Sequence, residues 1–110
     1  MKIPRKIYIL WNLVTNKVYV GSSSNTKMRF KIHINALRAG THPIEDLQDD
    51  FNKYGEMILF SIVDTIEEYS EKGKEYEWME KYKSYNRTLG YNYKDKHLFK
   101  EKATKGATNT

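Results

Sequence analysis

Two short segments with alternating side chains constrain the fold more than any other feature of the chain. Residues 6–12 (KIYILWN) and 17–22 (KVYVGS) alternate and are rich in β-branched and aromatic residues, a composition typical of strands. Only a short loop containing Thr15 and Asn16 separates them. The pattern therefore predicts a β-hairpin, and a hairpin requires antiparallel pairing.

The rest of the chain carries further helix and strand signals. Helical periodicity is expected over residues 26–39, 44–54 and 67–83, and a third, mostly buried strand over residues 57–65 (MILFSIVDT). Gly40 and Gly55 mark the ends of the first two helices, and Gly73 weakens or delays the start of the last one. The order strand, strand, helix, helix, strand, helix predicts a small α+β domain whose antiparallel sheet is covered by helices.

Positive charge is concentrated in the first part of the chain. From Met1 to Ile44 there are eight lysines or arginines and no acidic residue. From Glu45 onward, eleven basic and fourteen acidic residues give −3, so the whole chain carries +5. Such a cationic half favours a polyanionic partner, nucleic acid first. Ordinary solubilising charge is the alternative interpretation.

Composition excludes several kinds of protein. The chain has no cysteine, which excludes disulfides, thiolate zinc sites and cysteine nucleophiles. Its 110 residues fit one compact domain. Apolar runs such as Ile7 to Trp11 are too short to span a bilayer, and no signal peptide is visible. We therefore expect a soluble, cytoplasmic domain without membrane contact.

Each predicted hairpin strand places a tyrosine between aliphatic neighbours, Tyr8 in one and Tyr19 in the other. Side chains alternate between faces, so a loop of two or four residues places both phenols on one face. A loop of three or five residues without a bulge separates them. Two phenols on one face, followed by Gly21 and Ser22, would form a candidate reactive corner; tyrosines that merely suit strands explain the same pattern.

The predicted helix over residues 26–39 has two polar side chains on its apolar side. A helical projection places Lys27, Lys31, Asn35 and Arg38 on one solvent stripe. Arg29 and His33 fall outside it, within the apolar arc. A guanidinium on a covered face needs a partner, and a phosphate is one such partner. A structural salt bridge for Arg29 and a core position for His33 are the alternatives.

Glu75 is a comparable exception in the last predicted helix. The same projection puts Trp78, Met79 and Tyr82 on its side, whereas Glu77 and Glu80 point elsewhere. Buried carboxylates are usually paired or bind a metal, and Mg²⁺ often takes only one or two protein carboxylates. A salt bridge from Glu75 to Arg29 without chemistry is the alternative.

Six short motifs, in order along the chain, resemble the GIY-YIG nuclease family. They are Ile7-Tyr8, Tyr19-Val20-Gly21, Met28-Arg29-Phe30 with His33, Phe51-Asn52-Lys53-Tyr54-Gly55, Glu75 with Trp78, and Gly90-Tyr91-Asn92. The similarity is closest to the catalytic domains of phage-type homing endonucleases. Lys6 replaces the first glycine of the eponymous motif and Val20 its isoleucine, and neither change removes a reactive group.

The resemblance implies a three-stranded antiparallel sheet flanked by helices in residues 1–93, followed by a basic tail or the start of a linker in residues 94–110. It implies a catalytic set on one cationic face: Tyr8, Tyr19, Arg29, His33, Glu75 and Asn92. Glu75 is expected to hold one divalent cation, Mg²⁺ or its substitute Mn²⁺, and Arg29 a phosphate oxygen. Tyr8 or His33 is the expected base. Tyr19 would fix the water or Tyr8, and Asn92 would orient the site near Tyr8.

The activity that follows is hydrolysis of a phosphodiester in double-stranded DNA by a monomer, with no small-molecule ligand. The expected DNA contacts are Lys17, Ser22, Lys27, Lys31 and Arg38. A nucleic-acid-binding module without turnover and a branch- or flap-specific nuclease are the alternatives. A DNA-reading module is expected to follow the linker, unless the chain is a free-standing minimal nuclease.

Overall fold

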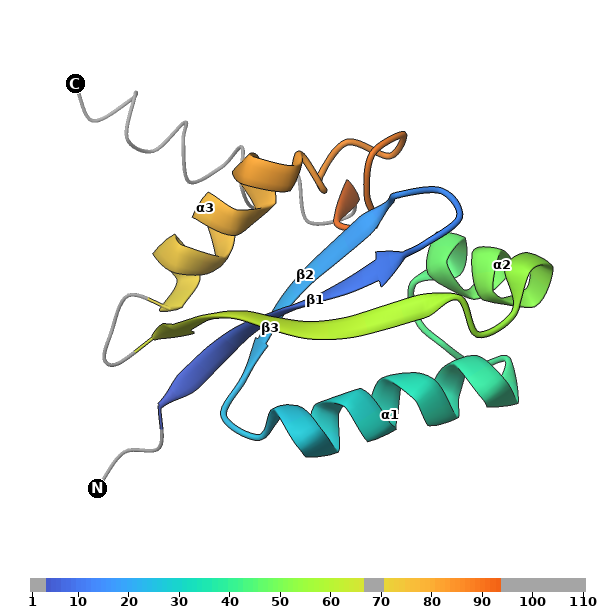
Figure 1. Cartoon of the computed structure of the whole chain (residues 1–110), viewed down its shortest axis with the longest axis horizontal. Coiled ribbons are helices and arrows are strands. Elements are labelled where there is room, and N and C mark those ends of the chain that lie inside the picture. Colours follow the sequence, from blue (N-terminus) through green and yellow to red (C-terminus); the bar gives the residue numbers. More distant parts are fainter. Residues whose placement is uncertain (1–3, 67–70, 94–110) are drawn as a thin grey trace.

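The computed structural model describes residues 4–66 and 71–93, and it contains the predicted elements in the predicted order (Figure 1). The strands are β1 (Arg5–Asn12), β2 (Val18–Ser23) and β3 (Ile58–Ile66), and the helices are α1 (Thr26–Ala39), α2 (Glu45–Tyr54) and α3 (Glu71–Tyr82). The α+β class is therefore confirmed. The first residues expected in the last helix, 67–70, and the tail from Lys94 lie outside the described residues.

The three strands form one antiparallel sheet in the order β2-β1-β3. In the β1–β2 hairpin, Leu10 lies opposite Tyr19 and Tyr8 lies opposite Gly21. The N–H of Asn12 donates to the carbonyl oxygen of Lys17 at 2.9 Å, so this pair encloses residues 13–16. This four-residue loop places Tyr8 and Tyr19 on one face, with ring centroids 6.4 Å apart.

Helices cover the two faces of the sheet and create two hydrophobic cores (Figure 1). On the face covered by α3, the buried core is Ile7, Ile9, Val18, Val20, Ile66 and Met79. On the face covered by α1 and α2, it is Tyr8, Leu10, Leu37, Leu47 and Tyr91. Successive side chains of β1 thus pack alternately into the two cores, as strand geometry requires. Tyr8 is therefore part of the core on the α1 side.

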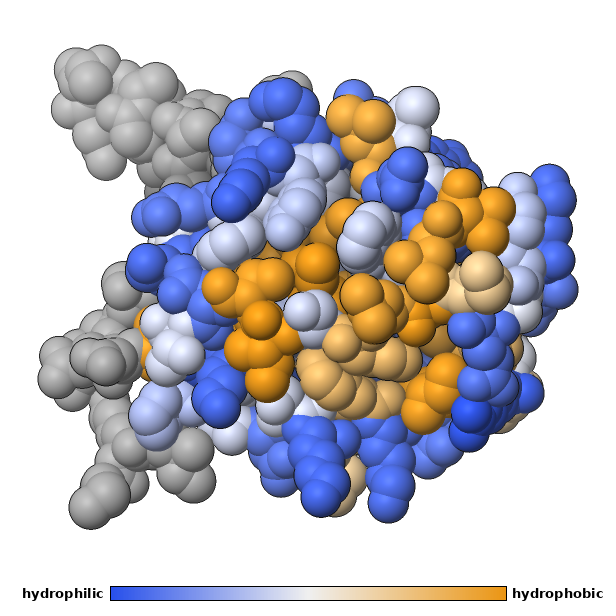
Figure 2. Space-filling model, in the orientation of Figure 1, coloured by the Kyte–Doolittle hydropathy of each residue, from blue (hydrophilic) through white to orange (hydrophobic). Residues whose placement is uncertain are grey.

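The expectation that the third strand is mostly buried is wrong. Only Ile66 of β3 is buried, and Leu59 and Ile62 are each 45% exposed. β3 is an edge strand, and α3 leaves part of the sheet open. A cavity of about 470 Å³ lies there, lined by residues that include Trp11, Leu59 and Tyr82. Figure 2 shows hydrophobic side chains gathered near the centre of the face in view.

The ends of α1 follow from local chemistry. The side chain of Asn25 accepts a hydrogen bond from the N–H of Met28 at 3.0 Å, which caps the first turn. Gly40 ends the helix with a φ of 76°, a left-handed conformation that glycine adopts without a Cβ clash. None of the helices in the described ranges has the length and hydrophobicity of a membrane span.

Candidate active site

The phenol of Tyr8 reaches the outer strand of the sheet because Gly21 leaves room for it. Tyr8 is 1% exposed, and its ring lies edge-on to those of Phe30 and His33, with centroids 5.4 and 5.6 Å away. A Cβ at position 21 would lie 2.5 Å from both Cζ and Oη of Tyr8. Only glycine at this position is therefore compatible with the observed place of the phenol.

Two histidines continue from Tyr8 in a hydrogen-bonded chain. Oη of Tyr8 lies 2.8 Å from Nε2 of His33, and Nδ1 of His33 lies 2.8 Å from Nε2 of His42. At the far end, the backbone N–H of Ile44 donates to Nδ1 of His42 at 3.1 Å. A backbone amide can only donate, so neutral His42 carries its proton on Nε2 and gives that hydrogen bond to Nδ1 of His33.

The same logic assigns the proton of His33. Its Nδ1 accepts from His42, so a neutral His33 carries its proton on Nε2 and donates to the oxygen of Tyr8. The opposite direction would require His42 to accept at both nitrogens, which a neutral imidazole cannot do. His33 is therefore a hydrogen-bond donor to Tyr8, and neither of its nitrogens has a lone pair left for a water molecule.

Burial sets the charge states along this chain. Burial lowers the pKa of His33 to about 4, helped by the nearby His42 and Arg29, and it also lowers the pKa of His42. Burial raises the pKa of Tyr8 to about 12, against the opposing charge and hydrogen bond of Arg29 and together with the charge of Glu75. At neutral pH both histidines are uncharged and Tyr8 is a phenol.

The free energy of unfolding should fall by about 2 kcal/mol between pH 7 and pH 5 through His33 alone. Its folded pKa of about 4 lies below the ordinary 6.5, so the unfolded chain takes up a proton in this range before the folded chain does. The contribution of His33 is complete above pH 6.5 and is lost as the pH falls towards 4. Urea titrations should show a smaller loss for His33→Asn; equal losses would mean that His33 is not held neutral.

Arg29 stands beside Tyr8 but is not covered. The expectation that it lies on a buried face of α1 is wrong: Arg29 is exposed, as are Met28 at 51% and Ile32 at 55%. Only His33 and Leu37 of this helix are buried. The physical reason is that α1 packs beside the outer strand β2, so part of its apolar arc extends past the sheet. Arg29 thus needs no internal partner and is accessible to an external anion.

Glu75 approaches the same strand from the α3 side. Its Oε1 accepts a hydrogen bond from the hydroxyl of Ser22 at 2.8 Å, and Nη2 of Arg5 donates to the same hydroxyl at 3.2 Å. Glu75 is half-buried with Met79 buried nearby on its helix, whereas Glu77 and Glu80 are exposed, as expected. Glu75 and Arg29 both act on the pKa of Tyr8. The charged groups therefore meet at the outer strand β2, coming from both sides of the sheet.

Asn92 braces the backbone of β2 between Tyr19 and Gly21. Its Oδ1 accepts from the N–H of Val20 at 2.8 Å, and its Nδ2 donates to the carbonyl oxygen of Val20 at 3.0 Å. Asn92 is 1% exposed. These two hydrogen bonds of Asn92 are thus to the backbone of Val20 and not to Tyr8, and its expected role in orienting the site stays a prediction.

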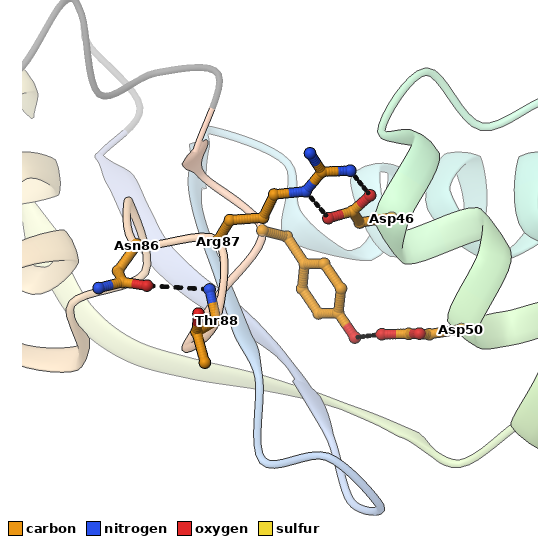
Figure 3. A network of polar contacts seen from close by, with 6 residues as sticks. Asp46, Asp50, Asn86, Arg87 and Thr88 are labelled. Carbon is orange, nitrogen blue, oxygen red and sulfur yellow. Dashed lines mark hydrogen bonds and ion pairs between the residues drawn. The ribbon is translucent and has the colours of Figure 1, made fainter.

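The segment that carries Asn92 is tied to α2 (Figure 3). Arg87 forms a two-pronged ion pair with Asp46 at 2.8 and 3.0 Å. The hydroxyl of Tyr91 donates to Asp50 at 2.7 Å and accepts from Nδ2 of Asn12 at 3.0 Å. These contacts hold residues 86–92 beside β2 and keep Asn92 in register with Val20.

Asn92→Ala should lower the free energy of unfolding by about 2 to 4 kcal/mol. The change leaves the buried N–H and carbonyl of Val20 without the partners that Asn92 supplies. Chemical denaturation of the variant measures the loss. Asn35→Ala, at an exposed position of α1, is the matched control and should unfold like the parent protein. Equal stabilities of the two variants would contradict a bracing role.

The five expected DNA contacts differ in how accessible they are. Lys27 and Lys31 are exposed on α1. Arg38 is paired with Glu56 at 2.7 Å, and the hydroxyl of Ser22 donates to Glu75. Nζ of Lys17 lies 5.6 Å from the ring centroid of Tyr91. Lys27 and Lys31 therefore remain the best candidates, whereas Ser22 orients Glu75 and Arg38 already has a carboxylate partner.

Two residues of the site were missed by sequence reasoning. Arg5 donates to the carbonyl oxygen and hydroxyl of Ser22 at 3.1 and 3.2 Å, and its charge lowers the pKa of Tyr8. His42 fixes the proton position on His33. Neither lies in a periodic pattern that marks it out, although a second histidine in the loop that follows the His33 helix was a usable signal for His42.

Comparison with known proteins agrees with this geometry. A family model described as the GIY-YIG catalytic domain matches residues 5–92. The chain is 42% identical over 60 residues to "Intron-associated endonuclease 1" of Enterobacteria phage T4, an alignment that covers 54% of this chain and 24% of that protein. The chain thus spans about a quarter of this relative's length.

Solved structures extend the comparison to the fold. One structure of the catalytic domain of homing endonuclease I-TevI has a TM-score of 0.71 and 32% identity, covering 79% of this chain and 95% of that one. A mutant of the same catalytic domain gives a TM-score of 0.70 at 32% identity, covering 80% and 91%. The three-stranded sheet with its helices is therefore a shared fold. With most of its length matched by the family model, the chain belongs to the GIY-YIG endonuclease family.

Proposed function

We propose that this domain hydrolyses a phosphodiester bond in double-stranded DNA, as a monomer and with one divalent cation. The observation that carries the proposal is that a phenol, a guanidinium and a carboxylate lie around the edge strand β2. The phenol of Tyr8 lies against Gly21, and Glu75 accepts a hydrogen bond from Ser22. The charges of Arg29 and Glu75 both act on the pKa of Tyr8. A nucleic acid substrate follows from the nuclease family. The cationic residues before Ile44 support DNA binding.

The side chains of the proposed site suit a divalent cation that keeps most of its water ligands. The described residues contain no group of three or more histidine, cysteine or acidic side chains that could hold a metal. Glu75 offers one half-buried carboxylate, oriented by Ser22. Mg²⁺ and Mn²⁺ accept such a site, whereas a structural zinc ion requires more protein ligands. When bound at Glu75, the cation would supply positive charge to offset that of the transition state and the leaving oxygen.

The choice of base falls on Tyr8 rather than His33. Both nitrogens of His33 are used, one as donor to Tyr8 and one as acceptor from His42. The oxygen of Tyr8 would orient the attacking water, and it would receive the proton of that water after the phenol has released its own proton to bulk water. His33 would stabilise that phenolate by donating a hydrogen bond from its Nε2–H. The high pKa of Tyr8 means that substrate or cation must lower it before this step.

Arg29 would bind a non-bridging oxygen of the scissile phosphate. Hydrolysis forms a bond between the water oxygen and phosphorus and breaks the bond from phosphorus to one deoxyribose oxygen. Negative charge grows on the phosphoryl oxygens in between, and a two-pronged guanidinium stabilises it. The exposure of Arg29 beside Tyr8 supports this role. Lys27 and Lys31 lie exposed one turn apart on a different surface of the same helix, and they would contact phosphates farther along the DNA.

A plasmid assay tests the proposal. Supercoiled DNA should be nicked or linearised in Mg²⁺ or Mn²⁺ and should stay intact with chelator. Arg29→Ala should cut about a hundredfold more slowly. Arg38→Ala is the matched control on the same helix, because Arg38 is already paired with Glu56. If the protein binds DNA in a salt-sensitive way but does not cut it in the presence of any metal, the domain is a nucleic-acid-binding module and not a nuclease.

A further inference from the structure

A cavity of about 240 Å³ opens beside Tyr19, Arg29 and His33, between α1 and the loop that leads into α2. Its walls include the aliphatic side chains of Ile32, Ala36, Pro43 and Ile44. Tyr19, Arg29 and His33 also line it, so the cavity is continuous with the proposed active site. We propose that this cavity receives the nucleobase next to the scissile phosphate, turned out of the DNA stack. The inference rests on the proposed nuclease function.

The lining favours a flat, weakly polar group over an anion. Although two histidines line the cavity, the nitrogens of both imidazoles are engaged within the protein, with Tyr8, with each other and with the N–H of Ile44. That N–H is used as well. The histidines thus present carbon edges and ring faces to a ligand. A phosphate or a metal ion finds no donor or lone pair on them.

Aromatic rings in the cavity offer surfaces for stacking. The rings of His33 and His42 are stacked with centroids 5.1 Å apart, and the ring of Tyr19 lies 5.8 Å from that of His33. Enzymes that accept an extruded base hold it between aromatic and apolar side chains. The volume is below the roughly 300 to 1,000 Å³ of sites for drug-sized ligands, so it suits one ring system better than a whole nucleotide.

Arg29 links the cavity to the reacting phosphate. It lines the cavity, and its charge lowers the pKa of Tyr8. A phosphate bound by Arg29 therefore has its neighbouring nucleotide at the mouth of the cavity. Ile32 stands 55% exposed at that mouth, with Met28 51% exposed one turn earlier on α1. Exposed aliphatic side chains of this kind insert beside bases and help to unstack them.

The consequence is a preference for DNA with an unpaired nucleotide beside the cut. Extruding a paired base costs unstacking and unpairing, and this cost is smallest for a base that is already unpaired. We expect cleavage at least about tenfold faster when the adjacent nucleotide is bulged or mismatched. An abasic site at that position keeps the flexible backbone but has no base to fill the cavity, so it should lose the advantage.

The test compares three duplexes after the cut has been mapped on paired DNA: fully paired, with one unpaired nucleotide beside the cut, and with an abasic residue there. Ala36→Leu fills the cavity, and its unpaired-to-paired rate ratio should fall from about ten or more to about one. Ala39→Leu, exposed on the same helix, is the matched control and should keep the parent ratio. Ile32→Ala, at an exposed position, removes one wall without threatening the fold and should also lower the ratio.

Failure of the inference is distinguishable from failure of the nuclease. Equal cleavage of the three duplexes by the parent protein, or an unchanged ratio in Ala36→Leu and Ile32→Ala, would overturn the base cavity while leaving the nuclease intact. If no DNA is cut, binding of a duplex that carries one unpaired 2-aminopurine decides. A fluorescence change seen with the parent and lost in Ala36→Leu supports the cavity, and identical signals contradict it.

Discussion

Glu75→Gln should cleave DNA about a thousandfold more slowly than the parent protein if Glu75 holds the proposed cation. A neutral amide holds a divalent cation far more weakly than a carboxylate, and the lost charge stabilisation amounts to several kcal/mol. The fold should be unaffected. The amide oxygen of glutamine can still accept the hydrogen bond that Ser22 donates to Oε1. Single-turnover cleavage measures the rate, and thermal unfolding measures the fold.

Glu77→Gln is the matched control for this change, since Glu77 is exposed on the same helix and differs in its surroundings only. It should cleave like the parent. The cleavage rate of Ser22→Ala should lie between the rates of Glu75→Gln and Glu77→Gln, about 10- to 100-fold below that of the parent. A loss of this size is expected when the hydrogen-bond partner of a metal-binding carboxylate is removed. Higher Mg²⁺ should partly restore Ser22→Ala and not Glu75→Gln. A Glu75→Gln protein that is unfolded instead of inactive would indicate a structural ion pair.

The local patterns predicted the elements because those patterns are set by short-range geometry. Alternation around Tyr8 and Tyr19 required a hairpin, and the helical spacing before Gly40 required α1; both are present. Even the shared face of the two tyrosines followed once the loop length was known. The family resemblance is confirmed by the family match over residues 5–92, whereas the grouping of the site residues that it implied stays a prediction.

The sequence did not predict which faces of the helices and strands are covered by other elements. The apolar arc of α1 suggested that Arg29 is buried, yet a sheet with β2 at its edge leaves that side open. Likewise, the apolar composition of β3 suggested burial, but its position at the opposite edge leaves Leu59 exposed. Burial of a helix or strand face is a tertiary property that periodicity alone does not determine.

The positions of the protons on the two histidines could also not be predicted from the sequence. The sequence left the choice between Tyr8 and His33 as base open, and the proposal of Tyr8 rests on a third group, His42, which lies against His33. The proton positions on both histidines depend on a single backbone N–H, that of Ile44, which any residue except proline supplies. No side-chain pattern can encode it.

Gly21→Ala should reduce cleavage by about a hundredfold, the effect of moving a catalytic group by about 1 Å. The added Cβ would lie 2.5 Å from Cζ and Oη of Tyr8, so the ring has to move. Its buried position between Phe30 and His33 leaves little space for this. Overpacking of this kind should also cost about 1 to 3 kcal/mol of stability. Cleavage rates and chemical denaturation of the same preparations check both effects.

A double-mutant cycle separates a clash with Tyr8 from a general effect of alanine in β2. If the clash is the cause, Gly21→Ala should be nearly without cost in a Tyr8→Ala background, because the atoms that it meets are gone. Tyr8→Phe removes the oxygen that His33 contacts and keeps the ring, so it should lose cleavage like Gly21→Ala. It should also lose about 1 to 3 kcal/mol of stability, because the buried Nε2–H of His33 is left without an acceptor. Normal cleavage by Gly21→Ala, with the expected loss of stability, would show that the phenol can leave its place without consequence. Tyr8 would then not be the group that orients the attacking water.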